Sequence, residues 1–351
     1  MSQGAVRIVA AIGAFLAIAF VGIAFVWNFS AEEASRSWAI LSAVAAIVAF
    51  AVYAGVEYLQ TGRVESVSRQ FDTRTIVLIP IAIAFNIILG QAVGQALRIP
   101  IYLDSIGTIL VGAVAGPIPG AVTGFLANML WTYVIPPPFH SDIAAPFAIV
   151  AVIIGLLAGL FGRFGWLRPR PNTSGQRLAL GGAVALLVIG LMAFYAYSRF
   201  YGDAGLVVFN PENTDPLFIV LGVVIAVITA AAIAGFFAFL FLRRDLTVAY
   251  VVVAGVVTGI VAALISAPIS ASLFTGVTGS GTDFLVAAFR QAGSDVSTAT
   301  FQQGLLSDPV DKLMTFLIVY LILNAMARRT KARFPQGEQL IPRPAVEGAA
   351  T

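Results

Sequence analysis

The stretch that decides the fold is SIGTILVGAVAGPIPGAVTGFLANMLWTYVI, residues 105–135. It contains two apolar runs without a charged residue, and the tight sequence Gly116-Pro117-Ile118-Pro119-Gly120 separates them. Proline and glycine together end one helix and begin the next. The stretch therefore predicts a short helical hairpin with arms over 105–116 and 118–135.

The composition of the whole chain resembles that of this hairpin. Of its 351 residues 59% are hydrophobic and 11% are charged, whereas ordinary soluble domains carry about 25% charged residues. Several apolar runs reach the roughly 20 residues that cross a hydrocarbon core as a helix. These runs are continuous and not alternating, which favours helices over a transmembrane barrel. We expect an all-α polytopic membrane protein.

Ten apolar segments stand between charged residues or on either side of the hairpin turn. They are 5–27, 38–58, 75–96, 105–116, 118–135, 144–162, 178–197, 217–242, 246–272 and 310–327.

Basic residues test this count, because lysine and arginine gather in cytoplasmic loops. With ten segments, all five basic clusters fall on one side of the membrane, and the loops of the other side carry most of the acidic residues. The clusters are Arg7; Arg63, Arg69 and Arg74; Arg163, Arg168, Arg170 and Arg177; Arg243 and Arg244; and Arg328, Arg329, Lys331 and Arg333. The sequence predicts a multi-pass protein of the cell (inner, cytoplasmic) membrane with both termini in the cytoplasm.

Three segments fall outside this series of spans. Residues 198–216 and 273–309 form two long outer loops. We expect the second loop to take part in function, since long structured loops are often lids or binding elements, while the first is as well explained as a connector. Residues 335–351, which contain three prolines, are expected to be a disordered tail.

The sequence carries no signature of an enzyme. It has no Walker A, GxSxG, HExxH or EF-hand pattern, and the absence of cysteine excludes disulfides and thiolate metal sites. The single histidine, His140, cannot build a multi-histidine metal site. We therefore expect no enzyme activity, no metal and no cofactor, and any use of ATP requires a partner protein. The net charge is +3, and the basic residues lie at the ends of the spans. This charge therefore does not indicate nucleic-acid binding.

Polar residues at membrane depth are the strongest candidates for function, because they are costly there unless they face a cavity or a neighbouring helix. Asp104, Ser105 and Thr108 open the first arm of the hairpin. Asp104 and Ser105 have an alternative role as helix caps. The functional hypothesis is that all three point towards a ligand near the outer surface.

A second group of candidates lies at the end of the second arm. Asn128 stands one turn below Trp131 on the same helix face. Trp131 is also explained as part of an aromatic belt, but an aromatic ring with an amide beneath it suits a flat heterocycle. His140, in the loop that follows, is a weaker candidate, because a lone loop histidine is more often a packing residue.

The last candidates come from the C-terminal third. Ser270 follows Pro268, which we expect to kink the ninth span, and Thr278 lies in a glycine- and hydroxyl-rich run suited to a gating loop or a plain linker. Asp308 and Pro309 read as the N-cap and first residue of the last helix. Asp311 and the adjacent Lys312 would then point to different faces, and either is a candidate to contact a charged substrate.

Several of these motifs together resemble the substrate-binding S components of energy-coupling factor (ECF) transporters. The matching stretches are 102–109, Gly116-Pro117 with 120–124 and Asn128, 145–151 leading into 155–159, and 308–312. The resemblance implies a six-helix bundle that binds a vitamin, a vitamin precursor or a related micronutrient at the outer side. It also implies partners, namely a T component and ATPase subunits that drive import.

The resemblance also implies a domain organisation. The core is 75–327, with a helix pair inserted at 178–242 and two further helices added at 1–60. Two rival functions stay open. One is a ligand-sensing membrane receptor, although the sequence shows no output domain. The other is a stand-alone secondary transporter, although such proteins commonly have an internal repeat or an acidic residue within a span, and neither is evident in the sequence. Glycines at 116, 120 and 124 leave a further choice between internal packing and a partner surface.

Overall fold

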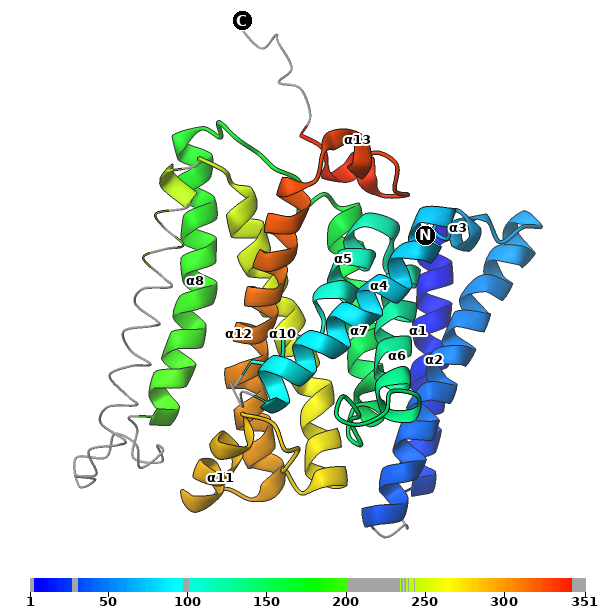
Figure 1. Ribbon diagram of the computed structural model, residues 1–351, viewed down its shortest axis with the longest axis vertical. Helices are drawn as coiled ribbons and strands as arrows, with labels where there is room; N and C mark the ends of the chain where they lie inside the picture. Colours follow the sequence, from blue (N-terminus) through cyan, green and yellow to red (C-terminus); the bar gives the residue numbers. More distant parts are fainter. Residues whose placement is uncertain are drawn as a thin grey trace, which may run out of the picture.

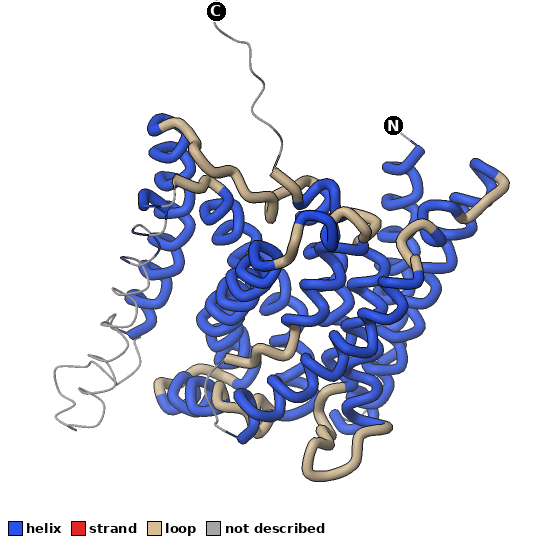
Figure 2. The backbone as a smooth tube through the Cα atoms, turned by 45° about the horizontal axis from the view of Figure 1, so that its top comes forward, coloured by secondary structure: helices blue, strands red, loops and turns tan. Residues whose placement is uncertain are grey.

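The computed structural model describes residues 3–26, 31–96, 101–200, 234, 236, 238, 240–242 and 244–342. Within these ranges the chain consists of helices and connecting loops, without a strand (Figure 2). The expected segment 217–242 and the expected loop 198–216 lie almost entirely outside the described residues.

The helices follow one another along the chain as shown in Figure 1. They are α1 (Gln3–Val26), α2 (Ala31–Thr61), α3 (Glu65–Ser68), α4 (Thr73–Leu89), η1 (Gly90–Ala96), α5 (Ile106–Ala115), α6 (Pro117–Tyr133), η2 (Ala145–Phe147), α7 (Ala148–Arg163), α8 (Gly175–Phe200), α10 (Thr247–Phe274), α11 (Asp283–Gln291), α12 (Val296–Ala325), α13 (Arg328–Lys331) and η4 (Gly337–Leu340).

Four helical stretches in the described part of the chain are long and apolar enough to cross a membrane. They are Thr73–Val93, Ala145–Arg163, Gly175–Tyr195 and Thr247–Phe274. This confirms the expectation of a helical chain that has helices long and apolar enough to span a membrane. The count of ten segments and the six-helix core stay predictions.

The hairpin is formed by α5 and α6, which meet at Gly116. Its φ of 130° lies in the region that favours glycine. Gly120 lies so close to α5 and α7 that a Cβ there would be 2.7 Å from the Cα of Gly112 and from the carbonyl oxygen of Gly155. Gly124 similarly faces the backbone of Ala151. At Gly120 and Gly124 the small residues therefore serve internal packing.

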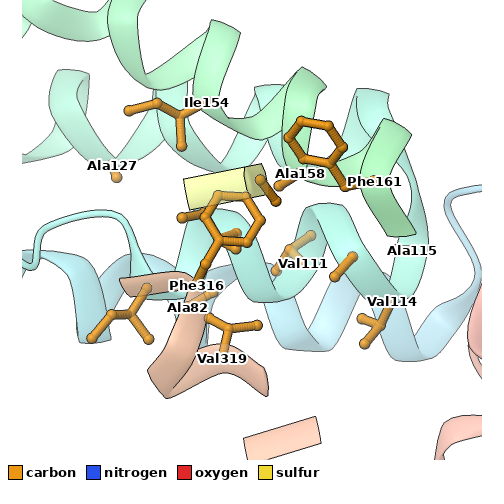
Figure 3. Close-up of a cluster of buried hydrophobic side chains, with 14 of the residues drawn as sticks. Ala82, Val111, Val114, Ala115, Ala127, Ile154, Ala158, Phe161, Phe316 and Val319 are labelled. Carbon is orange, nitrogen blue, oxygen red and sulfur yellow. The ribbon is translucent and has the colours of Figure 1, made fainter. Parts of the chain in front are cut away.

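The main hydrophobic core lies between the hairpin, α4, α7, α10 and α12. Figure 3 shows Phe161 of α7 and Phe316 of α12 reaching into it beside Val111 of α5. The rings of Phe161 and Phe316 meet edge to face with centroids 5.9 Å apart. The α1–α2 pair and α8 lie at opposite sides of this core (Figure 1), with α2 against α7 and α10, and α8 against α10.

Helix α12 corrects two expectations. It begins at Val296, where the Asp295 side chain accepts a hydrogen bond from Thr298 N, so Asp308 is not a cap and Pro309 lies within the helix. Residues 273–309 are therefore not a long loop, because they contain α11 and the first part of α12. Asp-Pro was a misleading signal, since the residues from Val296 to Asp308 already belong to the helix.

The segment after α13 is ordered further than expected. Gln336 N donates a hydrogen bond to the carbonyl oxygen of Val114 at 2.8 Å, and Leu340 is buried. Residues 335–342 thus cover the turn of the hairpin, although we expected them to be disordered. The rest of the expected tail, 343–351, lies outside the described residues.

The basic segments meet at one end of the bundle, which we call the basic end. Arg74 donates to the Arg333 carbonyl oxygen, and Arg170 N donates to Asp245. The start of α1, α3 and α13 lie at this end and α11 at the opposite end (Figure 1).

Candidate substrate-binding site

A cavity of about 120 Å³ opens among η1, α6, α7, α10 and α12, and Thr278 and Ser280, which shortly precede α11, lie in its wall. The segment 101–105 and the loops before η2 and after α10 complete its wall. Its lining residues are Gly90, Tyr102, Asp104, Ser105, Asn128, Trp131, Ser141, Ile143, Ala144, Phe147, Val150, Ala151, Ile154, Ala262, Ser266, Ala267, Ser270, Thr278, Ser280, Gln303, Asp308 and Lys312.

Most of the side chains expected to bind a ligand meet at this cavity. Six candidates line it: Asp104, Ser105, Asn128, Trp131, Ser270 and Thr278. Thr108, His140 and Asp311 do not. These three are held in hydrogen bonds to other parts of the chain.

Thr108 is buried between α4 and α5. Its hydroxyl accepts a hydrogen bond from Asn86 Nδ2 at 2.8 Å, and Asn86 Oδ1 accepts one from Gly107 N at 2.7 Å. A Cβ on Gly107 would lie 2.2 Å from the carbonyl oxygen of Ala82. Thr108 therefore helps to join two helices in close contact, and Asn86 is a buried polar residue that the sequence analysis passed over.

Trp131 forms part of the cavity wall and is only 5% exposed. That burial argues against an aromatic belt at a lipid boundary. Its Nε1 donates to the Phe139 carbonyl oxygen at 2.8 Å. The far edge of its ring lies against Gly90, where a Cβ would be 2.4 Å from the ring and 2.9 Å from Asp104 Cβ. Gly90 thus permits Trp131 and Asp104 to converge.

Asn128 lies beside Trp131 in the wall. Its Nδ2 donates to the carbonyl oxygen of Ala144 at 3.0 Å, which fixes the amide plane. Among the described residues, its Oδ1 accepts no hydrogen bond. Because Asn128 lines the cavity, its amide oxygen is placed to accept a hydrogen bond from a ligand.

Asp311 anchors the segment that leads into the hairpin. It is fully buried, and its Oδ1 accepts hydrogen bonds from Tyr102 N and Leu103 N, both at 2.9 Å. Its Oδ2 accepts one from Lys312 Nζ at 2.5 Å. Asp311 and Lys312 were expected to point to different faces, but the long lysine side chain turns back to its neighbour. Asp311 therefore supports the wall from behind.

Lys312 brings its ammonium group to the cavity. Besides Asp311, Nζ lies 3.0 Å from Ser105 Oγ, to which it donates, and 3.6 Å from Asp104 Oδ1. Neither Ser105 nor Asp104 caps α5 through its side chain in the expected way, since Ser105 occupies the N-cap position without a side-chain cap bond. Their side chains are turned towards Lys312 instead.

A row of hydroxyl groups closes the cavity on the side of the loop after α10. Tyr102 and Thr282 share a hydrogen bond of 2.7 Å, Thr282 and Ser280 one of 2.8 Å, and Ser280 and Thr278 one of 2.8 Å. Asp283 ends the row by accepting from Thr278 Oγ1 at 3.0 Å. The expected flexible run is therefore a hydrogen-bonded wall that joins α11 to the segment 101–105.

His140 lies in the exposed loop between α6 and η2. Its Nδ1 is 3.0 Å from the Ile135 carbonyl oxygen, and its Nε2 is 2.8 Å from Asp142 Oδ1. The hydrogen bond to the Asp142 carboxylate, supported by Ile135, raises the pKa of His140 above its ordinary value. Its role in the structure is to shape this loop.

Several lining residues were not among the candidates. Asp308 was set aside as a cap, and Phe147 appeared only within an apolar stretch. Tyr102 stood in the quoted motif without a role, while Ser141, Ser280 and Gln303 carry no signal of their own. One local pattern could have suggested a role for Tyr102. It lies two residues before Asp104, next to the predicted start of a helix.

The fold and the cavity together define the chain as an all-helical protein with membrane-spanning helices and a polar, aromatic-walled pocket within the bundle. Comparison of the chain with protein-family models, with curated proteins and with solved structures finds no match.

Proposed function

We propose that this chain is a membrane-embedded substrate-binding subunit of an ATP-driven importer, similar to the S components of ECF transporters. It captures a vitamin, vitamin precursor or similar small micronutrient at the outer face of the cell membrane. It is not an enzyme by itself, and it delivers its cargo through a T component and ATPase subunits.

The observation that carries this proposal is the convergence of Asn128, Trp131 and the segment 101–105 on one cavity inside an apolar helical bundle. Small-molecule sites are typically apolar cavities with a few polar groups that fix orientation. The mixture of an aromatic wall, an amide and charged groups suits a small heterocycle better than a lipid tail.

The arrangement of the helices supports an S-component-like core. Helices α4, α5, α6, α7, α10 and α12 contribute to one hydrophobic core. The α1–α2 pair and α8 pack on the outside of it, as an N-terminal addition and part of an inserted pair would. In this proposal the chain crosses the membrane with its basic end in the cytoplasm, and the cavity lies towards the outer side.

A thermal-shift screen of the purified full chain against B vitamins and their precursors tests the proposal. We expect one compound to raise the melting temperature by several degrees, because a ligand that binds only the folded state stabilises it. Asn128→Ala and Trp131→Ala should remove that shift, whereas Tyr133→Ala, on an exposed position of the same helix, should retain it. A folded sample that responds to no compound would contradict the proposal.

One observation favours a second candidate, a stand-alone secondary transporter. Asp308 lies inside α12 and lines the cavity, and a buried acidic residue that faces a cavity among membrane helices is typical of proton-coupled transport. Uptake into liposomes that contain this chain alone, driven by a proton gradient and lost in Asp308→Asn, would support this candidate. Uptake only with a T component and ATPases would exclude it.

A further inference from the structure

Asp308 is a buried carboxylate whose hydrogen-bond partners among the described residues are neutral. Its side chain is buried, with the residue 7% exposed, and it lines the cavity. Its Oδ1 accepts a hydrogen bond from Ser307 Oγ at 3.2 Å and its Oδ2 one from Ser266 Oγ at 3.1 Å. No basic side chain of the described residues forms an ion pair with it. A buried carboxylate with neutral partners alone is costly.

The ammonium group nearest in the wall is already engaged. Lys312, one helical turn after Asp308, lies 2.5 Å from Asp311 Oδ2 and 3.6 Å from Asp104 Oδ1. Lys312 is thus shared by Asp104 and Asp311, and among the described residues around the cavity acidic side chains outnumber basic ones. Ionised Asp104 and Asp308 would repel an anionic ligand, and a neutral ligand would leave Asp308 without an ion-pair partner among the described residues.

Three aromatic side chains line the same cavity, Tyr102, Trp131 and Phe147, and two of their rings are held in place by contacts behind the wall. The Trp131 ring is fixed by the hydrogen bond that its Nε1 donates to the Phe139 carbonyl oxygen. Phe147 is stacked on Phe274 with centroids 5.9 Å apart, which supports one of its faces from behind. Aromatic faces attract cations, and this attraction is stronger where water is excluded.

We propose that the ligand of this cavity is a flat, nitrogen-containing cation, with Asp308 as its counter-ion and Trp131 as a stacking surface. This inference rests on the proposed function and specifies its substrate class. A protonated or quaternary nitrogen compensates the carboxylate, and an N–H group on the same molecule donates to Asn128 Oδ1. The positive charge of the ligand then offsets the excess of acidic side chains among the described residues of the wall.

Matched pairs of ligands test the charge of the substrate. The probes are N-methylated pyridinium, pyrimidinium and imidazolium compounds and their neutral parent heterocycles, measured by thermal shift with the full chain. We expect at least one cation to stabilise the protein more than its neutral parent. Asp308→Asn should weaken the binding of that cation by roughly 10- to 100-fold, because it removes the negative charge that pairs with the cation.

A second comparison needs no ligand and uses two aspartates on one helix. Asp311→Asn should lower the melting temperature of the ligand-free protein, because it leaves Lys312 buried without its closest partner. Asp308→Asn should leave that temperature unchanged or raise it, because it removes an uncompensated carboxylate. If Asp308→Asn destabilises the ligand-free protein as much as Asp311→Asn, the carboxylate is structural and the inference is wrong.

The outcomes separate this inference from the proposed function. Neutral parents that bind as well as the cations, with no effect of Asp308→Asn, would leave a binding subunit standing and overturn the charge assignment. A chain that binds neither these probes nor any vitamin would overturn both.

Discussion

Gly90 is the residue on which the geometry of the cavity depends most directly. Its missing side chain lets the Trp131 ring and Asp104 approach the backbone of η1. No sequence pattern singles this glycine out, because glycine is common in membrane helices and its neighbour Trp131 is far away along the chain.

Gly90→Ala should therefore displace Trp131 and weaken ligand binding. The added Cβ would lie 2.4 Å from the indole ring, and overpacking of this kind costs about 1–3 kcal/mol of stability. Thermal unfolding and ligand titration measure both effects. Gly190→Ala is the matched control, since none of the described residues lies within 4 Å of the Cβ it would add. Equal behaviour of the two variants would contradict the close contact of Trp131 with Gly90.

His140 offers a second prediction at the residue scale. Because it is the only histidine in the chain, its NMR signal needs no assignment by mutation. The Asp142 carboxylate and the Ile135 carbonyl raise its pKa in the folded state, so we expect it to titrate above about 6.5. Any stabilisation from this contact is complete below the unfolded pKa and is lost as the pH rises through the folded one.

Asp142→Asn should move the His140 titration back towards the ordinary value. Ligand binding should be unchanged in this variant, because His140 and Asp142 lie outside the lining of the cavity. A His140 pKa that does not respond to Asp142→Asn would show that the hydrogen bond between them is not formed in solution.

At the scale of elements, the close packing of α5, α6 and α7 holds the cavity wall in place. Gly155 of α7 lies against Gly120 of α6, where an added Cβ would be 2.3 Å from the Gly120 carbonyl group. In lipid, where the hydrophobic effect does not drive helices together, such small-residue contacts are a main source of association.

Gly155→Ala should lower stability by about 1–3 kcal/mol, because backbone lies on the far side of the contact and cannot move as a side chain would. Unfolding of the variant in a mild detergent, measured beside Gly190→Ala, checks this expectation. A Gly155→Ala protein as stable as the control would mean that the three helices pack less closely than the structure describes.

The elements also show where prediction from the sequence succeeds and fails. The hairpin could be predicted because Gly116 and Pro117 act locally. The common position of Asn128 and Trp131 in one site could also be predicted, because the two residues share one helix face. The course of α12 could not, because Pro309 is tolerated within a helix whose partner offers Gly259 at the point of contact. That contact joins residues far apart in the sequence and leaves no local pattern. Because Asp308 was expected to be a helix cap, its position in the wall of the cavity was not predicted.

For the molecule as a whole, the separation of the basic end from the end that carries α11 predicts an orientation. The chain contains no cysteine, so single cysteines introduced at Ser297 and Arg329, both exposed, report on the two ends. We expect a membrane-impermeant maleimide to label Ser297→Cys in intact cells, and Arg329→Cys only after lysis. The reverse pattern would refute the orientation derived from the basic residues.

The central claim is that the cavity beside Trp131 holds a small molecule. Native mass spectrometry of the full chain, released from membranes in a mild detergent, tests it and requires no candidate ligand to be chosen. We predict one small-molecule adduct per chain in the unmodified protein and in Tyr133→Ala, and its loss in Asn128→Ala and Trp131→Ala. An unmodified protein without an adduct after growth in rich medium, or an adduct that survives both substitutions, would contradict the claim.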